Sequence, residues 1–221
     1  MAALLTVLAI AAGVALGIAN GGRFERVLHF RPELWPVGAA GVAVQFLLRV
    51  TGIGGGWAVA IDILSGIALI WFALANIRVG GMVLVVAGLM LNMVPIVINW
   101  GMPTSLDALV RSGIVADPPP AVVDLDGPRH VATADDSLRW LGEVIAVPTK
   151  QVISFGDGLL QIGYLLVTAS LLRGRIVRRD PDGDYPRRIA ALGRGPARRR
   201  GPGTHPSRLD RGIGSGPGSE P

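Results

Sequence analysis

The most informative pattern in the chain is a series of long apolar blocks separated by short polar segments. The blocks cover residues of about 2–19, 34–50, 57–76, 79–100 and 155–172. A helix that crosses a bilayer needs about 20 mostly apolar residues. Each block approaches or reaches that length, so the pattern predicts an all-α polytopic membrane protein with about five transmembrane helices.

The charges between the blocks predict which segments face the cytoplasm. Residues 173–221 contain 12 arginines and 5 acidic residues, whereas residues 101–151 contain 7 acidic and 4 basic residues. Basic segments remain on the cytoplasmic side. We therefore expect a multi-pass plasma-membrane protein with its N-terminus outside, its C-terminus in the cytoplasm and a long extracytoplasmic loop at 101–151. The predicted topology anchors are Arg23, Arg26, Arg173, Arg175, Arg178 and Arg179.

The chain divides by composition into a helical membrane domain at 1–175 and a basic cytoplasmic tail at 176–221. The tail is rich in glycine, proline and arginine and has few apolar residues to bury, which predicts disorder. The bilayer itself is the expected partner, and the arginines that begin the tail are suited to anionic lipid headgroups. Nucleic acid is a poor candidate, because the arginine run at 198–200 has no interleaved aromatic residues for base stacking.

The first apolar block has a second interpretation, as a cleaved secretory signal with small residues at 17–19. A signal peptide carries positive charge before its apolar core. Here the first arginine, Arg23, follows the core. A retained first helix is therefore the prediction, and cleavage is the alternative.

The composition narrows the chemistry that is open to the protein. The chain has no cysteine, which excludes disulfides, thiolate catalysis and cysteine-ligated metals. Its three histidines, His29, His130 and His205, lie far apart in the sequence. We predict neither a cofactor nor a metal site.

Two acidic residues, Asp62 and Asp157, fall inside the apolar blocks near their predicted outer ends, and Glu143 lies in the loop above them. Two neighbouring carboxylates that share a proton activate water in aspartic proteases, so these three are the candidate catalytic residues. Structural alternatives exist for both buried acids. Asp157 fits a capping box with Ser154, and Asp62 is placed to pair with Arg49.

Other polar and small residues predict local structure. Asn99, Gly101, Ser154 and Asp157 form a predicted polar cluster at the outer face. A capping box at 104–107 precedes an expected short helix at 108–114, and the segment 131–141 contains a second box, from Thr133 to Asp136, with a second short helix. Interhelical hydrogen bonds are expected from Gln45, Asn92 and Gln161, and close helix packing from Gly13, Gly17, Gly66, Gly81, Gly88 and Gly163.

Four short motifs occur in order at residues 20–23 (NGGR), 99–103 (NWGMP), 140–145 (WLGEVI) with Pro148, and 153–157 (ISFGD). In this order and spacing, the chain resembles the bacterial multi-pass membrane proteins of domain-of-unknown-function family 5317 from residue 1 to about 175. The resemblance implies the membrane architecture and adds no activity. A second resemblance, of residues 142–145 and 154–157 to the end of lipoprotein signal peptidases, implies Glu143 and Asp157 as a catalytic dyad.

These observations favour a non-enzymatic structural or partner-binding membrane component. The first alternative is an aspartyl-type intramembrane hydrolase, which needs two carboxylates close enough to share a proton. The second is a small-solute or ion transporter, which needs a polar path through Asp62, Gln45 and Asn92. Transporters of this kind usually have broken helices, and Pro95 is the candidate break.

Overall fold

A computed structural model describes residues 2–174 of the chain. The predicted tail, including Arg175, Arg178 and Arg179, lies outside the described residues. The helices are α1 (Ala2–Ala19), α2 (Phe24–Leu28), α3 (Trp35–Thr51), α4 (Gly56–Ala75), α5 (Met82–Asn99), α6 (Leu106–Arg111), the 3₁₀ turn η1 (Arg139–Leu141) and α7 (Phe155–Arg173). The short strands are β1 (Met102–Thr104), β2 (Arg129–Val131), β3 (Ile145–Val147) and β4 (Gln151–Ile153).

The predicted helical blocks are present, with small differences at their ends. Three of them, α4, α5 and α7, are long and apolar enough to cross a membrane, while the apolar stretches of α1 and α3 are shorter. The fourth block begins at Met82, not at residue 79, because Gly81 takes a left-handed conformation with φ of 96°. The chain therefore has the helix composition of a membrane protein.

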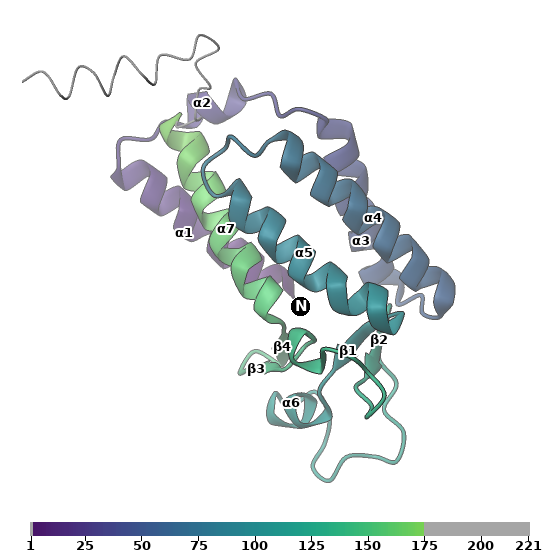
Figure 1. The fold of residues 1–221 in the computed structure, drawn as a ribbon. Helices are drawn as coiled ribbons and strands as arrows, with labels where there is room; N and C mark the ends of the chain where they lie inside the picture. Colours follow the sequence, from purple (N-terminus) through teal and green to yellow (C-terminus); the bar gives the residue numbers. More distant parts are fainter. Residues whose placement is uncertain (1, 175–221) are drawn as a thin grey trace, which may run out of the picture. The chain divides into compact units, whose positions relative to one another are not determined.

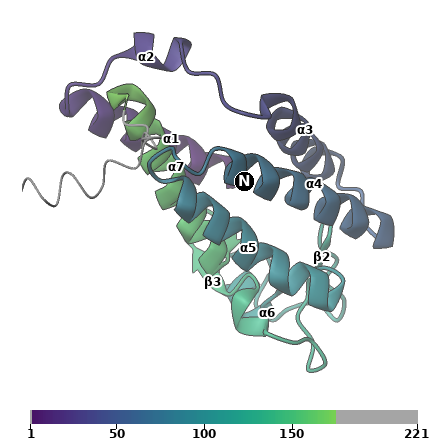
Figure 2. The same ribbon diagram turned by 45° about the horizontal axis from the view of Figure 1, so that its top comes forward.

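The five apolar helices lie side by side in the spatial order α1, α7, α5, α4, α3 (Figures 1 and 2). Gly13 of α1 faces Leu165 of α7, and Gly17, one turn further along α1, faces Leu172. The contacts thus advance together along both chains, which shows that α1 and α7 run in the same direction. The other neighbouring pairs are antiparallel; in α3 and α4, for example, Gly38 faces Phe72 whereas Gln45, further along α3, bonds to Asp62, which is earlier in α4. As a result, α7, the last helix in the sequence, lies between α1 and α5.

Glycines bring the backbones of these helices close together. A Cβ atom on Gly88 of α5 would lie 2.7 Å from the carbonyl oxygen of Gly156 in α7. On the other side of α7, a Cβ atom on Gly13 would lie 2.5 Å from the carbonyl oxygen of Leu165. These contacts confirm the predicted packing role of Gly13 and Gly88, and the structure adds Gly156 to it.

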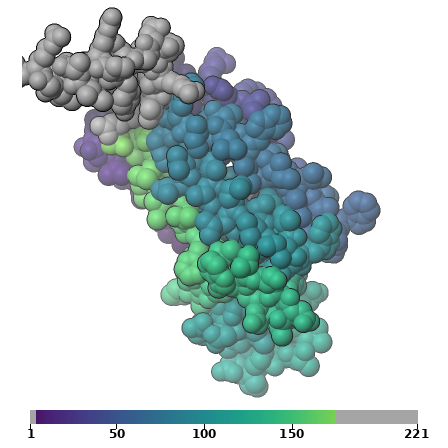
Figure 3. All heavy atoms as spheres, in the orientation of Figure 1, coloured from purple at the N-terminus to yellow at the C-terminus, as the bar shows by residue number. Residues whose placement is uncertain are grey.

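Residues 101–153 form a compact unit, called here the cap, at the end of the helices where α5 finishes and α7 begins (Figure 3). Strand β1 is buried at its centre, pairs in parallel with β2, and forms a bridge to Glu143 on its other side. Strands β3 and β4 form an antiparallel hairpin. The cap has its own apolar cluster around Ala108, Leu109 and Val152, so it is a folded unit and not an extended loop.

The two short helices that the sequence predicted in this region are corrected by the structure. The first begins at Leu106 and ends at Arg111, and Ser105 caps it by accepting a hydrogen bond from the Ala108 N–H. Thr104 was the wrong cap residue because it lies in strand β1 and bonds elsewhere. The second predicted helix is wrong: residues 129–131 are a strand, and only η1 is helical.

We expect Gly156→Ala to destabilise the protein by about 2 kcal/mol, since overpacking a tight contact costs about 1–3 kcal/mol. The added Cβ would clash with Asn92 Oδ1 and would lie 2.7 Å from the Gly88 carbonyl oxygen. Thermal unfolding of the purified protein in detergent measures the change. The matched control is Gly158→Ala, two residues along α7, where the new Cβ meets nothing within 4 Å. That variant should be neutral or more stable, because alanine favours a helix over glycine by up to about 1 kcal/mol; equal losses in both would contradict the packing role.

Candidate functional site

The described polar residues concentrate where the cap meets the helix ends, here called the junction: Asn92, Asn99, Thr104, Glu143, Ser154 and Asp157. Three of them form a closed network between α5 and α7. The Ser154 hydroxyl donates to Asn92 Oδ1 over 2.7 Å, and Asn92 Nδ2 donates to Asp157 Oδ1 over 2.8 Å. Each side chain in this network therefore fixes the orientation of another.

The same network contains the predicted capping box of α7. The Asp157 N–H donates to Ser154 Oγ, and the Ser154 N–H donates to Asp157 Oδ2, both over 3.0 Å. Ser154 is fully buried. With Oδ1 bonded to Asn92 and Oδ2 bonded to the backbone, both oxygens of Asp157 act as structural acceptors in this geometry.

Glu143 is held on the cap side of the junction. Its Oε2 accepts a hydrogen bond from the Thr104 hydroxyl over 3.0 Å and lies 3.5 Å from Arg129 Nη1. Its backbone N–H donates to the Pro103 carbonyl, and its carbonyl accepts from the Ser105 N–H. Glu143 is therefore an integral member of the small sheet around β1.

Burial raises the pKa of the Glu143 carboxyl above its ordinary value. The Arg129 guanidinium and the Thr104 hydroxyl partly offset this rise, and the negative charge of Asp157 adds to it. Arg49, from the end of α3, also lowers the pKa slightly. Glu143 is thus a buried carboxyl whose protonation changes the charge of the junction.

The sequence placed Glu143 and Asp157 together as a possible dyad. The structure brings them to the same junction, where the charge of Asp157 acts on Glu143. In residues 2–174, however, no hydrogen bond joins the two carboxylates; each is bonded to other partners. The arrangement holds both acids in place and does not present a shared proton.

The third candidate acid, Asp62, belongs to a separate cluster between α3 and α4. Its Oδ1 accepts from Gln45 Nε2 over 2.9 Å, and Gln45 also lies 3.2 Å from Ser65 Oγ. The expected ion pair with Arg49 is absent among the described residues, and the side chain that bonds to Asp62 from α3 is Gln45. Asp62 and Asn92 have no common partner among the described hydrogen bonds, so these bonds do not join the residues of the predicted polar path.

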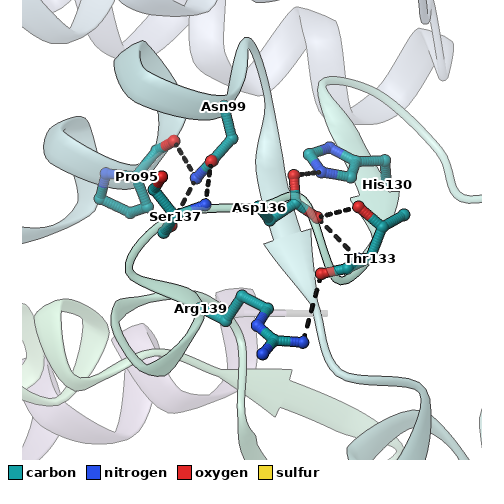
Figure 4. A network of polar contacts seen from close by, with 7 residues as sticks. All are labelled: Pro95, Asn99, His130, Thr133, Asp136, Ser137 and Arg139. Atoms are coloured by element: carbon teal, nitrogen blue, oxygen red, sulfur yellow. Dashed lines mark hydrogen bonds and ion pairs between the residues drawn. The ribbon is translucent and has the colours of Figure 1, made fainter.

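A second set of contacts fastens the cap to the end of α5 (Figure 4). Asn99 Nδ2 donates to the carbonyls of Pro95 and Ser137, and the Ser137 N–H donates back to Asn99 Oδ1 over 2.8 Å. Nearby, Asp136 accepts from the Thr133 N–H over 2.7 Å and lies 3.0 Å from His130 Nε2. The Thr133–Asp136 motif thus forms a turn that presents Ser137 to Asn99.

Contacts with His130 help to explain the lowered pKa of Asp136 and the conformation of Gly101. Burial acts to raise the pKa of Asp136, but the hydrogen bonds from the Thr133 N–H and the His130 ring outweigh it, so this pKa lies below its ordinary value. Gly101 has φ of 149°, and a Cβ there would lie 3.0 Å from His130 Nδ1. Only glycine fits this turn comfortably.

At the opposite end of the bundle, two of the predicted anchors close helix α7. Arg26 Nη1 donates to the Arg173 carbonyl over 2.7 Å, and the Arg23 N–H donates to the Leu172 carbonyl over 2.9 Å. The last carbonyls of a helix have no partner within it, and arginine is favourable there. Arg23 and Arg26 therefore have a structural role besides any role in topology.

The described residues contain no group of three or more histidine, cysteine, aspartate or glutamate side chains that would hold a metal ion. The predicted interhelical hydrogen bonds are confirmed. Gln45, Asn92 and Gln161 each hydrogen-bond to a neighbouring helix, Gln161 through Thr6 of α1.

The small sheet of the cap, including the contact of Thr104 with Glu143, was not predicted from the sequence. No local sequence pattern marks strands of three residues.

Comparison with known proteins assigns the chain to a protein family. Residues 32–169 match a family of unknown function, DUF5317. This match covers more than half of the chain, so the protein belongs to that family and the resemblance seen in the sequence is confirmed. Neither the curated proteins nor the solved structures contain a significant match.

The junction network generates a stability prediction for Ser154→Ala. The change removes the N-cap of α7 and the donor to Asn92 Oδ1, so we expect a loss of about 2 kcal/mol, the upper range for an N-cap. Ser105→Ala is the matched control, because Ser105 caps α6 through one hydrogen bond of 3.3 Å. Thermal unfolding in detergent should show a clearly larger loss for Ser154→Ala. If the two variants lost the same stability, Ser154 would be only a helix cap.

The raised pKa of Glu143 predicts a pH dependence. A carboxyl with a raised folded-state pKa binds its proton more tightly in the folded chain. Its stabilising contribution is present below the ordinary value of 4.5 and is lost as the pH rises through the folded-state pKa. Lowering the pH from about 7.5 to about 5 should therefore stabilise the wild type more than Glu143→Gln.

The comparison is made by thermal unfolding at both pH values, with Asp135→Asn as the control. The Asp135 side chain is exposed in the same cap, so its removal should leave the pH response unchanged. Asp136 does not interfere, since its lowered pKa places its loss of stability below about pH 3.8. An unchanged pH response in Glu143→Gln would show that Glu143 is not the titrating group.

Proposed function

We propose that this protein is a non-enzymatic membrane component in which five membrane-spanning helices hold the cap rigidly at the extracytoplasmic surface, as a structural or partner-binding platform. One observation carries the proposal: both carboxylates at the junction serve as structural hydrogen-bond acceptors, Asp157 between the ends of α5 and α7 and Glu143 inside the cap, while Asn99 at the end of α5 bonds to Ser137 of the cap. Asp157 bonds to Asn92 and its own helix start, and Glu143 bonds to Thr104 and Arg129.

The packing of the two shorter apolar helices supports five spans. Helix α1 lies along α7 through glycine contacts and the hydrogen bond between Gln161 and Thr6. Helix α3 lies along α4 through Gly38, Gly41 and Gln45. Each runs beside a helix that is long enough to span the bilayer. Such packing also supports a retained first helix, because removal of α1 would expose the polar face of Gln161.

The direction of the helices supports the predicted orientation. The turns that contain Arg23, Arg26, Arg31 and Arg78 lie at the end opposite the cap, as does Arg173 at the end of α7. Short basic loops remain in the cytoplasm. The cap, where acidic residues outnumber basic ones, is then extracytoplasmic, and the N-terminus lies on the same side.

The two alternative functions have less support. A hydrolase needs a proton shared between two carboxylates, whereas those of Glu143 and Asp157 are separately bonded. For that alternative, purified protein would have to cleave membrane-anchored peptides, and Glu143→Gln would have to abolish cleavage. A transporter needs a continuous polar path, and the clusters of Asp62 and Asn92 are separate.

Single cysteines introduced into this cysteine-free chain test the topology. We expect a membrane-impermeant maleimide to label Val122→Cys in the cap and Ile53→Cys between α3 and α4 in intact cells. Leu28→Cys in α2 should be labelled only after the membrane is opened. Both Val122 and Leu28 are 82% exposed in the structure, so a difference between them reports the side of the membrane and not burial.

The labelling pattern has clear contrary outcomes. Equal labelling of all three cysteines in intact cells would contradict a membrane-spanning bundle. Labelling of Leu28→Cys together with protection of Val122→Cys would reverse the orientation. Opposite sides for Ile53→Cys and Val122→Cys would exclude five spans, because both positions lie at the cap end of the helices.

A further inference from the structure

The surface of the cap contains an open pocket of about 380 Å³ beside the junction. Its walls include the apolar side chains of Leu106 and Val144, the indole of Trp140, the guanidinium of Arg139 and the carboxylate of Asp107. One pocket thus combines a cation, an anion and an aromatic ring. None of these groups is used by the junction.

The charged groups of the pocket keep free binding capacity. Arg139 donates to the Thr133 carbonyl over 3.3 Å and forms no ion pair with any residue in the described part of the chain. A guanidinium has five N–H donors, and only one of those of Arg139 is used in the described hydrogen bonds. Asp107 is paired with Arg111, but both side chains are exposed, and such surface pairs are weak and exchangeable.

The pocket lies at the level of the helix ends. Ser137, two residues before Arg139, is bonded to Asn99 in the last turn of α5, and η1 packs against α5 (Figure 4). Exposed aromatic residues occur at the same end of the helices: Trp57 at the start of α4, Trp100 after α5 and Phe155 at the start of α7. Tryptophan is enriched at the headgroup level of membranes.

We propose that this pocket binds the headgroup of a zwitterionic phospholipid from the outer surface of the bilayer. Arg139 holds the phosphate, because a guanidinium recognises phosphate oxygens through paired hydrogen bonds. The ammonium group lies against the indole of Trp140 and near the carboxylate of Asp107, since an aromatic face and an anion both attract a cation. Leu106 and Val144 contact the apolar part of the lipid.

A lipid fits this combination better than a soluble zwitterion of the same charges. Trp140 is 60% exposed and belongs to η1, which contacts α5, a helix with exposed apolar residues near this end such as Val97 and Ile98. A lipid whose headgroup binds there keeps its acyl chains in the bilayer. The bilayer thus raises the local concentration of the headgroup at the pocket without further contacts. The inference rests on the proposed membrane placement of the cap.

The test uses the purified full-length protein in detergent and short-chain lipids. Binding of dihexanoyl phosphatidylethanolamine, dihexanoyl phosphatidylglycerol and free phosphoethanolamine is measured by native mass spectrometry. We expect the zwitterionic lipid to bind most tightly. Arg139→Gln should weaken its binding about tenfold, the effect of losing a charge-assisted hydrogen bond. Asp107→Asn should reduce the preference for the zwitterionic over the anionic lipid.

Two controls are matched to these changes. Arg78→Gln removes an arginine from the opposite end of the bundle, and Trp57→Ala removes an indole that is 84% exposed outside the pocket. Neither should affect binding, whereas Trp140→Ala should weaken it. Equal effects of Arg139→Gln and Arg78→Gln would overturn the proposal. So would a preference for the anionic lipid, or phosphoethanolamine binding as tightly as the lipid. These assays need no bilayer, so they fail independently of the cysteine-labelling experiment.

Discussion

The hydrogen bonds among Asn92, Ser154 and Asp157 are the contact on which the rest of the structure depends. They join α5 to α7 at the point where the chain returns from the cap to the helices. A polar group buried without partners is costly, and in this network both oxygens of Asp157 and the Ser154 hydroxyl are satisfied. The start of α7, and with it the central position of that helix, is fixed by these bonds.

The network requires the helix backbones to approach closely, which explains the small residues around it. Gly156 of α7 lies against Asn92 and Gly88 of α5, and neither of the two glycines has space for a Cβ. Helices in a membrane gain little from burying apolar surface against each other, so close packing and hydrogen bonds hold them together. The glycines and the polar network are therefore two parts of one solution, because each short hydrogen bond depends on the short distance between backbones.

Much of this was predictable from local sequence patterns. Apolar block length gave the helices, and the spacing of Ser154 and Asp157 gave the cap of α7. The partner of Asp62 was not predictable, because Gln45 and Arg49 both lie on α3, the helix that packs against α4. Only the rotation of α3 about its axis decides which of the two side chains bonds to Asp62, and in the structure it is Gln45. The cap sheet was also hidden, since β1 and Glu143 are far apart in the sequence and strands of three residues carry no periodicity.

Apolar contacts hold the interior of the cap and hydrogen bonds attach it to the helices, and this difference explains why the cap suits a binding role. Its interior is held by an apolar cluster around Leu109 and by the contact of Thr104 with Glu143, whereas its attachment to α5 uses directional hydrogen bonds between Asn99 and Ser137. Apolar packing tolerates rotation, but hydrogen bonds at several separate points do not. A cap that is fastened to α5 by paired hydrogen bonds and continues directly into α7 keeps a constant orientation to the helices, so any surface that it presents, including the pocket at Arg139, stays at a fixed position relative to the helix ends.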